Sequence, residues 1–285
     1  MTETKVKEIL KRKGIDPSLG IKRLAPGKKN YNVKPIIEME RVDLPYRFVP
    51  GFLPSTSGLH FFNRFPPNTK YPVINLPGVN EIKLGDASNG LCGGFVYTSL
   101  DLFLVNPRKD PPLVFDPPAE GTAQFNYLTN RLLDSFGQNN GYDNALKIIA
   151  WTQTPDHERI INGPLGHGLA HRMVLEEWPN IKADIDSGRP SPLMLVMEPL
   201  CGVGDIVGIV VALQRSHQVL AYAYRLDNNN LTIYIYDCNQ PNSDSENISL
   251  NISKPDHSIK ISSRYTQLRG FFRSNYSSRN PQPYY

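Results

Sequence analysis

The stretch GDASNGLCGGFVYTSLDLFLV, residues 85–105, places one of the chain's three cysteines directly before an apolar segment. Gly93 and Gly94 follow Cys92, and the apolar residues after them recur with helical spacing. The pattern predicts a helix over residues 92–105 that begins at Cys92. Backbone N–H groups and the helix dipole favour a thiolate at such a position, whereas a buried, inert cysteine is the alternative interpretation.

Helical patterning dominates the middle of the chain, and strand patterning dominates the C-terminal part. Helices are predicted over residues 92–105, 122–136, 143–151 and 168–186. Strands are predicted in SPLMLVME (191–198), GIVVALQ (208–214), SHQVLAYAYRL (216–226), NLTIYIYD (230–237), ISLNIS (248–253) and RGFFRSNY (269–276). Helices followed by strands with short connections indicate an α+β fold with a mostly antiparallel sheet.

The two strands around LDNNN, residues 226–230, form a predicted hairpin. With these five residues as the loop, Arg225 lies opposite Leu231, and opposed residues share a face of the sheet. His217 and Asp237 then become diagonal neighbours on one face, with about 7–8 Å between their backbones. A register shift of one residue would separate them, so the pairing depends on this loop.

A histidine held by a carboxylate is the general-base half of a nucleophilic triad, because the carboxylate orients the imidazole and stabilises the imidazolium. The face that carries His217 and Asp237 also carries Ala221 and Ala223, whose small side chains leave room for a helix. The helix that begins at Cys92 is the predicted occupant of that face. A hydrogen-bonded histidine of the core is the alternative interpretation of His217.

The order of these residues resembles the papain-like cysteine peptidase superfamily, and the His…Asp pairing looks closest to its bacterial C39-like branch. The matching segments, spread over roughly residues 85–237, are NGLCGGFVYTSLDLF, WPNIKADIDSGRPSPLMLVM, SHQVLAYAY and IYIYDCNQP. The resemblance implies a papain-like fold, with the cysteine at the start of the central helix. It also implies a thiol hydrolase with Cys92 as nucleophile, His217 as general base and Asp237 as orienting acid, acting on a peptide or amide-containing substrate without a cofactor.

The chain departs from this family at the oxyanion hole. Relatives usually carry Gln six residues before the nucleophile, whereas this chain has Asp86, a carboxylate that would repel an oxyanion. Asn89 is a candidate replacement donor beside the backbone N–H of Cys92. Asn89 is equally interpreted as a residue of the capping turn.

Three functions are compatible with these residues. Hydrolysis of a peptide or amide is the first, and acyl transfer by a transglutaminase-like or acetyltransferase-like enzyme with the same triad is the second. The third is a non-catalytic interaction module on the same fold, which the departure at Asp86 motivates. Thiol reactivity at neutral pH would distinguish the module from both enzymes.

Two other patterns suggest less specific sites. His167 and His171 have the i, i+4 spacing of zinc ligands on a helix, but Gly168 stands where a zinc peptidase has Glu. We therefore expect no metal site.

Four tyrosines (Tyr222, Tyr224, Tyr234 and Tyr236) are predicted on the far face of the hairpin, where they form a packing surface or a ligand platform.

Composition and charge bound the remaining possibilities. Residues 1–29 carry nine Lys/Arg against Glu3, Glu8 and Asp16, so the other residues have a net charge of −2 within the total of +4. That distribution argues against a dedicated nucleic-acid binder. Three scattered cysteines argue against a disulfide framework, and the absence of an apolar signal or spanning segment predicts a cytoplasmic protein without a membrane span. The oligomeric state stays open.

The domain organisation follows from the distribution of proline. Residues 1–84 are predicted to form a basic N-terminus and an ordered arm rich in proline and aromatic residues, lying across the core. Residues 85–285 form the predicted catalytic domain.

Overall fold

The computed structural model describes residues 46–69, 86–105, 110–157, 159–160, 165–197, 206–254 and 260–284. The chain divides into two compact units, Met1–Leu44 and Pro45–Tyr285, and the described residues all belong to the second. The basic N-terminus and Cys201 lie outside the described residues.

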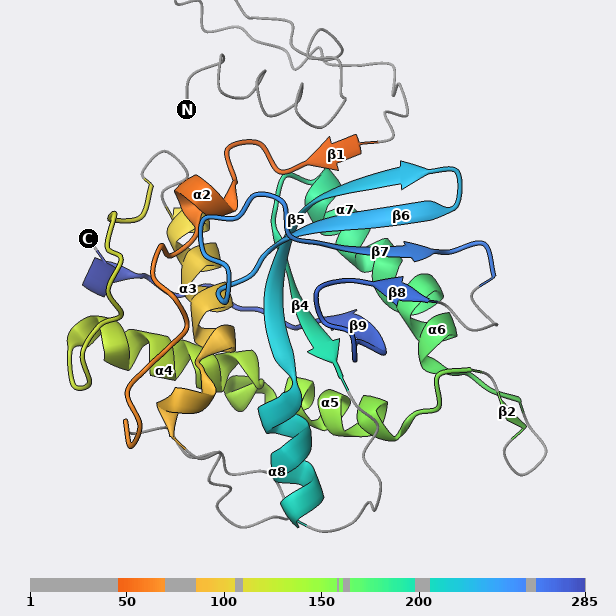
Figure 1. Cartoon of the computed structure of the whole chain (residues 1–285), viewed down its shortest axis with the longest axis horizontal. Coiled ribbons are helices and arrows are strands. Elements are labelled where there is room, and N and C mark those ends of the chain that lie inside the picture. Colours follow the sequence, from red (N-terminus) through yellow and green to blue (C-terminus); the bar gives the residue numbers. More distant parts are fainter. Residues whose placement is uncertain are drawn as a thin grey trace, which may run out of the picture. The chain divides into compact units, whose positions relative to one another are not determined.

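A single curled antiparallel sheet organises this unit (Figure 1). Its strands follow the order β8-β7-β6-β5-β4-β9, and β1 pairs with β5 as well. Their bounds are β1 Tyr46–Phe48, β4 Ser191–Val196, β5 His217–Asp227, β6 Asn230–Tyr236, β7 Asn247–Asn251, β8 Ile261–Ser262 and β9 Gly270–Arg273. A separate short pair joins β2 (Arg159–Ile160) to β3 (Leu165–Gly166). The predicted α+β class with an antiparallel sheet is confirmed.

The described α-helices lie between β1 and β4 in the chain, except the last, which lies between β4 and β5. The α-helices are α2 Pro54–Ser57, α3 Cys92–Val105, α4 Ala123–Ser135, α5 Asp143–Gln153, α6 Leu169–His171, α7 Trp178–Asp186 and α8 Ile206–Arg215. The 3₁₀-helices are η1 Ala87–Asn89, η2 Gln138–Asn140 and η4 Gln282–Tyr284, and η3 Arg172–Glu177 is a π-helix. Helix α3 packs on α4 and on β5, while α7 also contacts β5. Within the described ranges, no helix has both the length and the apolar character needed to cross a bilayer.

One predicted strand is wrong. GIVVALQ, residues 208–214, lies inside helix α8 and directly precedes β5. A short apolar run rich in β-branched residues does not distinguish a strand from a buried helix by periodicity. In this fold the run packs against α5, with Ala212 and Leu213 buried.

The turn between β5 and β6 also differs from the prediction. Leu226, rather than Arg225, lies opposite Leu231, so the register near the turn is shifted by one residue. The loop shortens to Asn228 and Asn229, and Asn228 adopts a φ of +52°. Asparagine tolerates this left-handed conformation, which a two-residue hairpin turn requires.

A β-bulge in β5 then restores the predicted register. The ladder is irregular between Ala221 and Ala223, and beyond it Ala221 lies opposite Ile235, as expected from the sequence. His217 and Asp237 both lie on this restored side of the bulge. The bulge also turns Ala223 to the face opposite Ala221, because a bulge reverses the alternation of side chains.

Helix α3 does not pack on the alanine face that the sequence suggested. Its Ser99 hydroxyl accepts from the N–H of Leu59, whose carbonyl accepts from the Tyr236 hydroxyl. Its Phe103 contacts Phe52, whose ring lies 5.7 Å from that of Tyr222. The predicted tyrosine side of the hairpin is therefore a packing surface for α3 at these positions. Tyr224, on the other side of the bulge, packs edge-on against Trp178 of α7.

The described part of the predicted arm, residues 46–69, belongs to the same core. Strand β1 extends the sheet along β5, and the aromatic residues Phe52, Phe61 and Phe65 are buried. Phe61 and Phe65 both pack edge-on against Phe95 of α3. This segment consequently lies against the helix that begins at Cys92.

Candidate active site

Cys92 is the first residue of α3, as the sequence predicts. Two glycines let this end of the helix approach its neighbours closely. A Cβ at Gly93 would lie 2.4 Å from Nε2 of Gln218, and one at Gly94 would lie 2.3 Å from the carbonyl oxygen of Leu128 in α4. A Cβ at Gly94 would collide with backbone, and one at Gly93 would displace the Gln218 side chain, so both glycines allow α3 to fit closely between α4 and β5.

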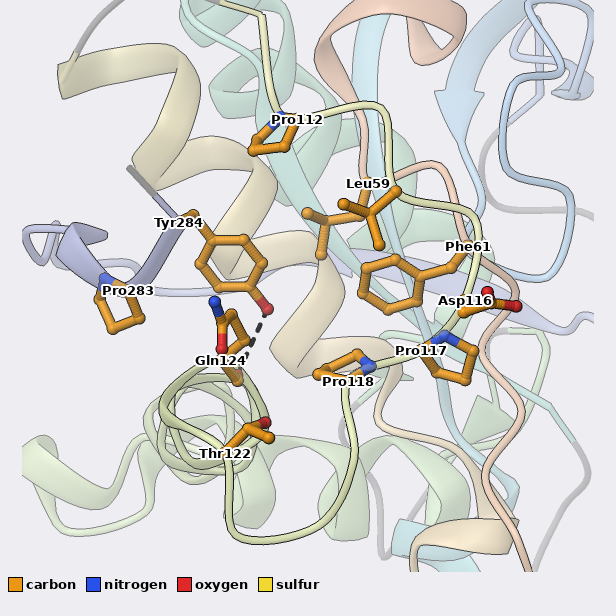
Figure 2. Close-up of a pocket in the computed structure, with 11 residues that line it drawn as sticks. Leu59, Phe61, Pro112, Asp116, Pro117, Pro118, Thr122, Gln124, Pro283 and Tyr284 are labelled. Atoms are coloured by element: carbon orange, nitrogen blue, oxygen red, sulfur yellow. Dashed lines mark hydrogen bonds between the residues drawn. The ribbon is translucent and has the colours of Figure 1, made fainter.

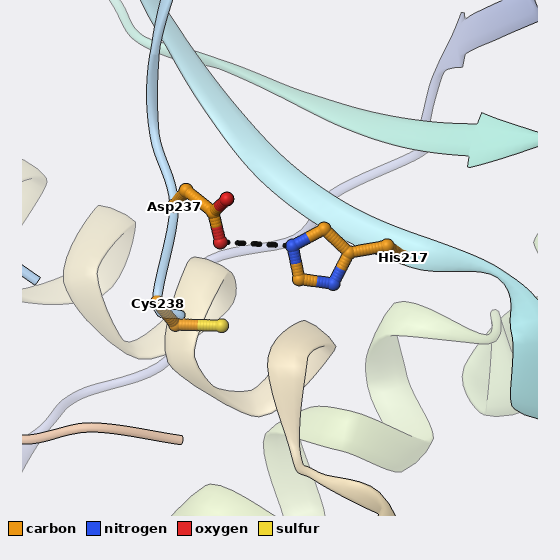
Figure 3. Close-up of side chains that lie close together, drawn as sticks. All are labelled: His217, Asp237 and Cys238. Carbon is orange, nitrogen blue, oxygen red and sulfur yellow. Dashed lines mark hydrogen bonds and ion pairs between the residues drawn. The ribbon is translucent and has the colours of Figure 1, made fainter. Parts of the chain in front are cut away.

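His217 and Asp237 come from two paired strands, of which β5 packs against this helix. His217 is the first residue of β5, and Asp237 directly follows the last residue of β6. Nε2 of His217 lies 2.9 Å from Oδ1 of Asp237, and both side chains are buried (Figure 3). The side chain of Cys92 lies close enough to the His217 ring to raise its pKa. The structure thus brings together the three residues that the sequence singled out.

Asp237 is surrounded by donors. Its Oδ1 also accepts from the backbone N–H of Asn239 at 2.9 Å, and its Oδ2 accepts from the Tyr265 hydroxyl at 2.6 Å. Arg264 adds a longer ion pair at 3.6 Å. Burial raises the pKa of Asp237, but the hydrogen bonds from His217, Tyr265 and Asn239 outweigh it and lower the pKa to about 2. The carboxylate is therefore charged at neutral pH.

The pKa of His217 moves in the opposite direction. Burial alone lowers it, whereas the hydrogen bonds and charges of Asp237 and Cys92 raise it to about 10. The residue is only 8% exposed, so these partners are not screened by bulk water. The imidazolium form is favoured over the whole neutral range.

Cys238 also reaches this site, which the sequence did not predict. Strand alternation assigned it to the opposite face, but β6 ends at Tyr236 and the chain turns after it. Its sulfur lies within 4.8 Å of donor atoms of His217 and Asp237. Burial, followed by the Asp237 carboxylate, raises the pKa of the Cys238 thiol well above its ordinary value. This second thiol is therefore held protonated.

A soft divalent ion such as zinc could in principle use the His, Asp and Cys donors of this cluster. The short contact between His217 and Asp237 instead has the 2.9 Å length of a hydrogen bond. The raised pKa of Cys238 opposes the deprotonation that metal binding requires. We interpret the cluster as a hydrogen-bonded one.

Asn89 and Asp86 lie in the turn before α3. Asp86 caps η1: its carboxylate accepts from the backbone N–H groups of Ser88 and Asn68, each at 2.8 Å. The Ser88 hydroxyl, followed by these backbone groups, lowers the pKa of Asp86. Asn89 is the last residue of η1 and is exposed, three positions before Cys92. Asp86, at the position of the usual Gln, thus has a structural partner set of its own.

The rings of His167 and His171 stack face to face, with centroids 3.7 Å apart. Among the described residues, the only group of three or more metal-binding side chains is the one around His217. Within the described ranges, no third ligand for a zinc ion therefore lies beside this histidine pair.

A cavity of about 430 Å³ lies apart from the catalytic candidates. It is apolar and rich in proline, and Figure 2 shows Phe61 and Tyr284 among the rings that face it. None of Cys92, His217 and Asp237 is among its lining residues.

Comparison of the chain with protein-family models, with curated proteins and with solved structures finds no match in any of the three. The interpretation of the site consequently depends on its geometry.

Proposed function

We propose that the chain is a papain-like thiol hydrolase that cleaves a peptide or another amide. Cys92 is the nucleophile, His217 is the general base that takes the Cys92 proton and then the acid that protonates the amine, and Asp237 is the residue that orients the imidazole. One observation carries this proposal. A single buried imidazole is hydrogen-bonded to a carboxylate through Nε2 and also has a cysteine at a helix N-terminus as an electrostatic neighbour.

The charges of the three groups support this assignment. With a pKa of about 2, Asp237 is a carboxylate at neutral pH, and with a pKa of about 10, His217 is an imidazolium. The proposed reaction starts from a thiolate at Cys92, at the N-terminus of α3 and beside the cationic ring. The resting site is then a thiolate–imidazolium pair held in place by Asp237.

The chemistry follows the usual two steps of thiol acyl transfer. The Cys92 sulfur adds to the amide carbonyl carbon, and the imidazolium of His217 gives its proton to the departing amine as the C–N bond breaks. The neutral imidazole then takes a proton from water, whose oxygen attacks the thioester and releases a carboxylic acid. The sulfur leaves as a thiolate, and His217 is an imidazolium again.

The oxyanion would be stabilised by the backbone N–H of Cys92 and by the Asn89 amide. The carboxylate of Asp86 is turned to the N–H groups of Ser88 and Asn68, which gives it a structural role. Its presence in place of Gln is thus compatible with catalysis, and the motive for a non-catalytic module is weakened. Acyl transfer to an amine would use the same triad and differ only in the acceptor.

Selective alkylation tests the proposal. Iodoacetamide at about pH 6, followed by peptide mapping, should label Cys92 well before Cys201 and Cys238, because Cys92 combines an imidazolium neighbour with access to solvent, whereas Cys238 is buried. His217→Gln should abolish the fast labelling of Cys92 at pH 6, whereas labelling of Cys92 at pH 9 should stay fast. Equal, slow labelling of all three cysteines in the wild type would overturn the proposal and favour the module.

A further inference from the structure

Asn63, in the segment before α3, contacts both halves of the candidate site. Its Oδ1 accepts a hydrogen bond from the backbone N–H of Leu91 at 2.6 Å, and Leu91 is the residue directly before the nucleophile. Its own backbone N–H donates to the carbonyl oxygen of Cys238 at 3.2 Å. Its Nδ2 lies 3.4 Å from Oδ1 of Asn239, a longer contact.

The turn before the nucleophile is shaped to admit this side chain. Gly90 has a φ of +91°, a conformation that L side chains rarely adopt. A Cβ at this position would lie only 2.5 Å from Nδ2 of Asn63. The Asn-Gly-Leu-Cys sequence is thus explained in part by the close approach of the Asn63 amide to the backbone.

The contacts of Asn63 continue to the general-base pair. The backbone N–H of Asn239 donates to Asp237 at 2.9 Å, and the Asn239 amide lies 3.4 Å from the hydroxyl of Tyr265. Tyr265 in turn donates to Asp237 at 2.6 Å, and its ring lies 4.9 Å from that of His217. One asparagine therefore joins the start of α3 to the turn that carries Asp237.

We propose that Asn63 is a positioning residue that sets the sulfur of Cys92 against the His217–Asp237 pair. This inference rests on the proposed function. The nucleophile and the pair come from separate elements, α3 and the β5–β6 hairpin, which lie more than a hundred residues apart in the chain. A displacement of about 1 Å between reacting groups costs on the order of 10²-fold in rate, so a direct link between the elements has a large effect.

The test measures the rate of Cys92 alkylation by iodoacetamide from pH 5 to pH 9 in the full chain. Asn63→Ala should slow labelling at pH 6 by about 10–10²-fold and shift the profile toward alkaline pH, because the thiolate–imidazolium pair is loosened. Gly90→Ala, which displaces the same amide through its added Cβ, should act in the same direction. Either variant decides the question if the other fails to fold.

Asn144→Ala is the matched control. Asn144 is buried and uses both ends of its amide, donating to the carbonyl of Ser135 and accepting from the N–H of Asn275, so these bonds do not involve Cys92, His217 or Asp237. It should lower the denaturant midpoint without moving the labelling profile of Cys92.

The outcomes separate this inference from the proposed function. Fast labelling of Cys92 in the wild type with an unchanged profile in Asn63→Ala overturns the positioning role alone. An equal slowing in Asn144→Ala overturns it too, since the effect would then be a general loss of stability. Slow labelling of Cys92 in the wild type overturns the proposed function, and the role of Asn63 with it.

Discussion

Replacing Asp237 by Asn removes the charge that supports the imidazolium and keeps most of the geometry. Asn is nearly isosteric, and its Oδ1 still accepts from Nε2 of His217 and from the N–H of Asn239. An opposite charge at hydrogen-bonding distance raises a histidine pKa by roughly 1–3 units. The pKa of His217, about 10 with the carboxylate present, should therefore fall to about 7–9 in Asp237→Asn.

The same substitution should change the acid limb of stability. The pKa of Asp237 is lowered from 3.8 to about 2 in the folded protein, so its stabilisation is present above pH 4 and lost as the pH falls through about 2. A shift of this size corresponds to about 2 kcal/mol for a buried group. The wild type should lose that part of its unfolding free energy between about pH 4 and pH 2, whereas Asp237→Asn should lose correspondingly less.

Two measurements check the argument. An NMR titration of the imidazole protons, with the His217 signal assigned by its loss in His217→Gln, gives the pKa, and urea unfolding gives the stability. Asp156→Asn is the control, because Asp156 is an exposed ion-pair partner of Arg269 outside the site. A His217 pKa that stays near 10 in Asp237→Asn would refute the assignment of its shift to the carboxylate. An equal fall in Asp156→Asn would refute it as well.

Two further predictions concern the oxyanion hole and the core. Asn89→Ala should lower turnover by about 10²–10³-fold with little change in Cys92 labelling if its amide serves the oxyanion. If Asn89 instead stabilises the turn, it should cost about 1 kcal/mol in a denaturant titration and leave turnover intact. Arg131→Leu should lower the unfolding free energy by about 3–5 kcal/mol, because it leaves Asp101, which is 0% exposed, without its ion pair. A loss below 1 kcal/mol would contradict that interpretation.

The sequence was informative where the signal is local. The helix at Cys92 is predicted with its observed bounds because its start, its glycines and its apolar spacing are contiguous. The helical nature of residues 208–214 was missed because a short run of β-branched residues is ambiguous without its packing partner. The position of Cys238 was missed because alternation was extended past Tyr236, where the strand ends.

Contacts between distant segments had no such signal. Asn63 and Tyr265 lie in irregular segments, and neither has a periodic neighbour that would place it beside Asp237. Their roles depend on how the segment before α3 and the connection between β8 and β9 fold onto the end of the sheet. A single sequence does not record such packing.

Two sulfurs lie beside one imidazole, and their environments explain which of them is suited to react. Cys238 is fully buried next to a carboxylate, so both burial and charge disfavour its thiolate. Cys92 is only partly buried and begins a helix, where the backbone dipole favours an anion. The sequence alone singles out Cys92 because it begins a helix. The structure adds that Cys238 is buried beside a carboxylate.

The pairing of His217 with Asp237 depends on the bulge in β5. If the register at the turn, with Leu226 opposite Leu231, continued along the hairpin, Asp237 would lie opposite Leu220. It would then point to the other face from His217, because neighbouring residues of a strand alternate. The extra residue between Ala221 and Ala223 removes this one-residue shift before the ladder reaches the site. The five-residue loop predicted from the sequence and the observed two-residue loop with a bulge therefore lead to the same pair. The bulge explains why the observed two-residue turn is compatible with the contact of 2.9 Å between His217 and Asp237.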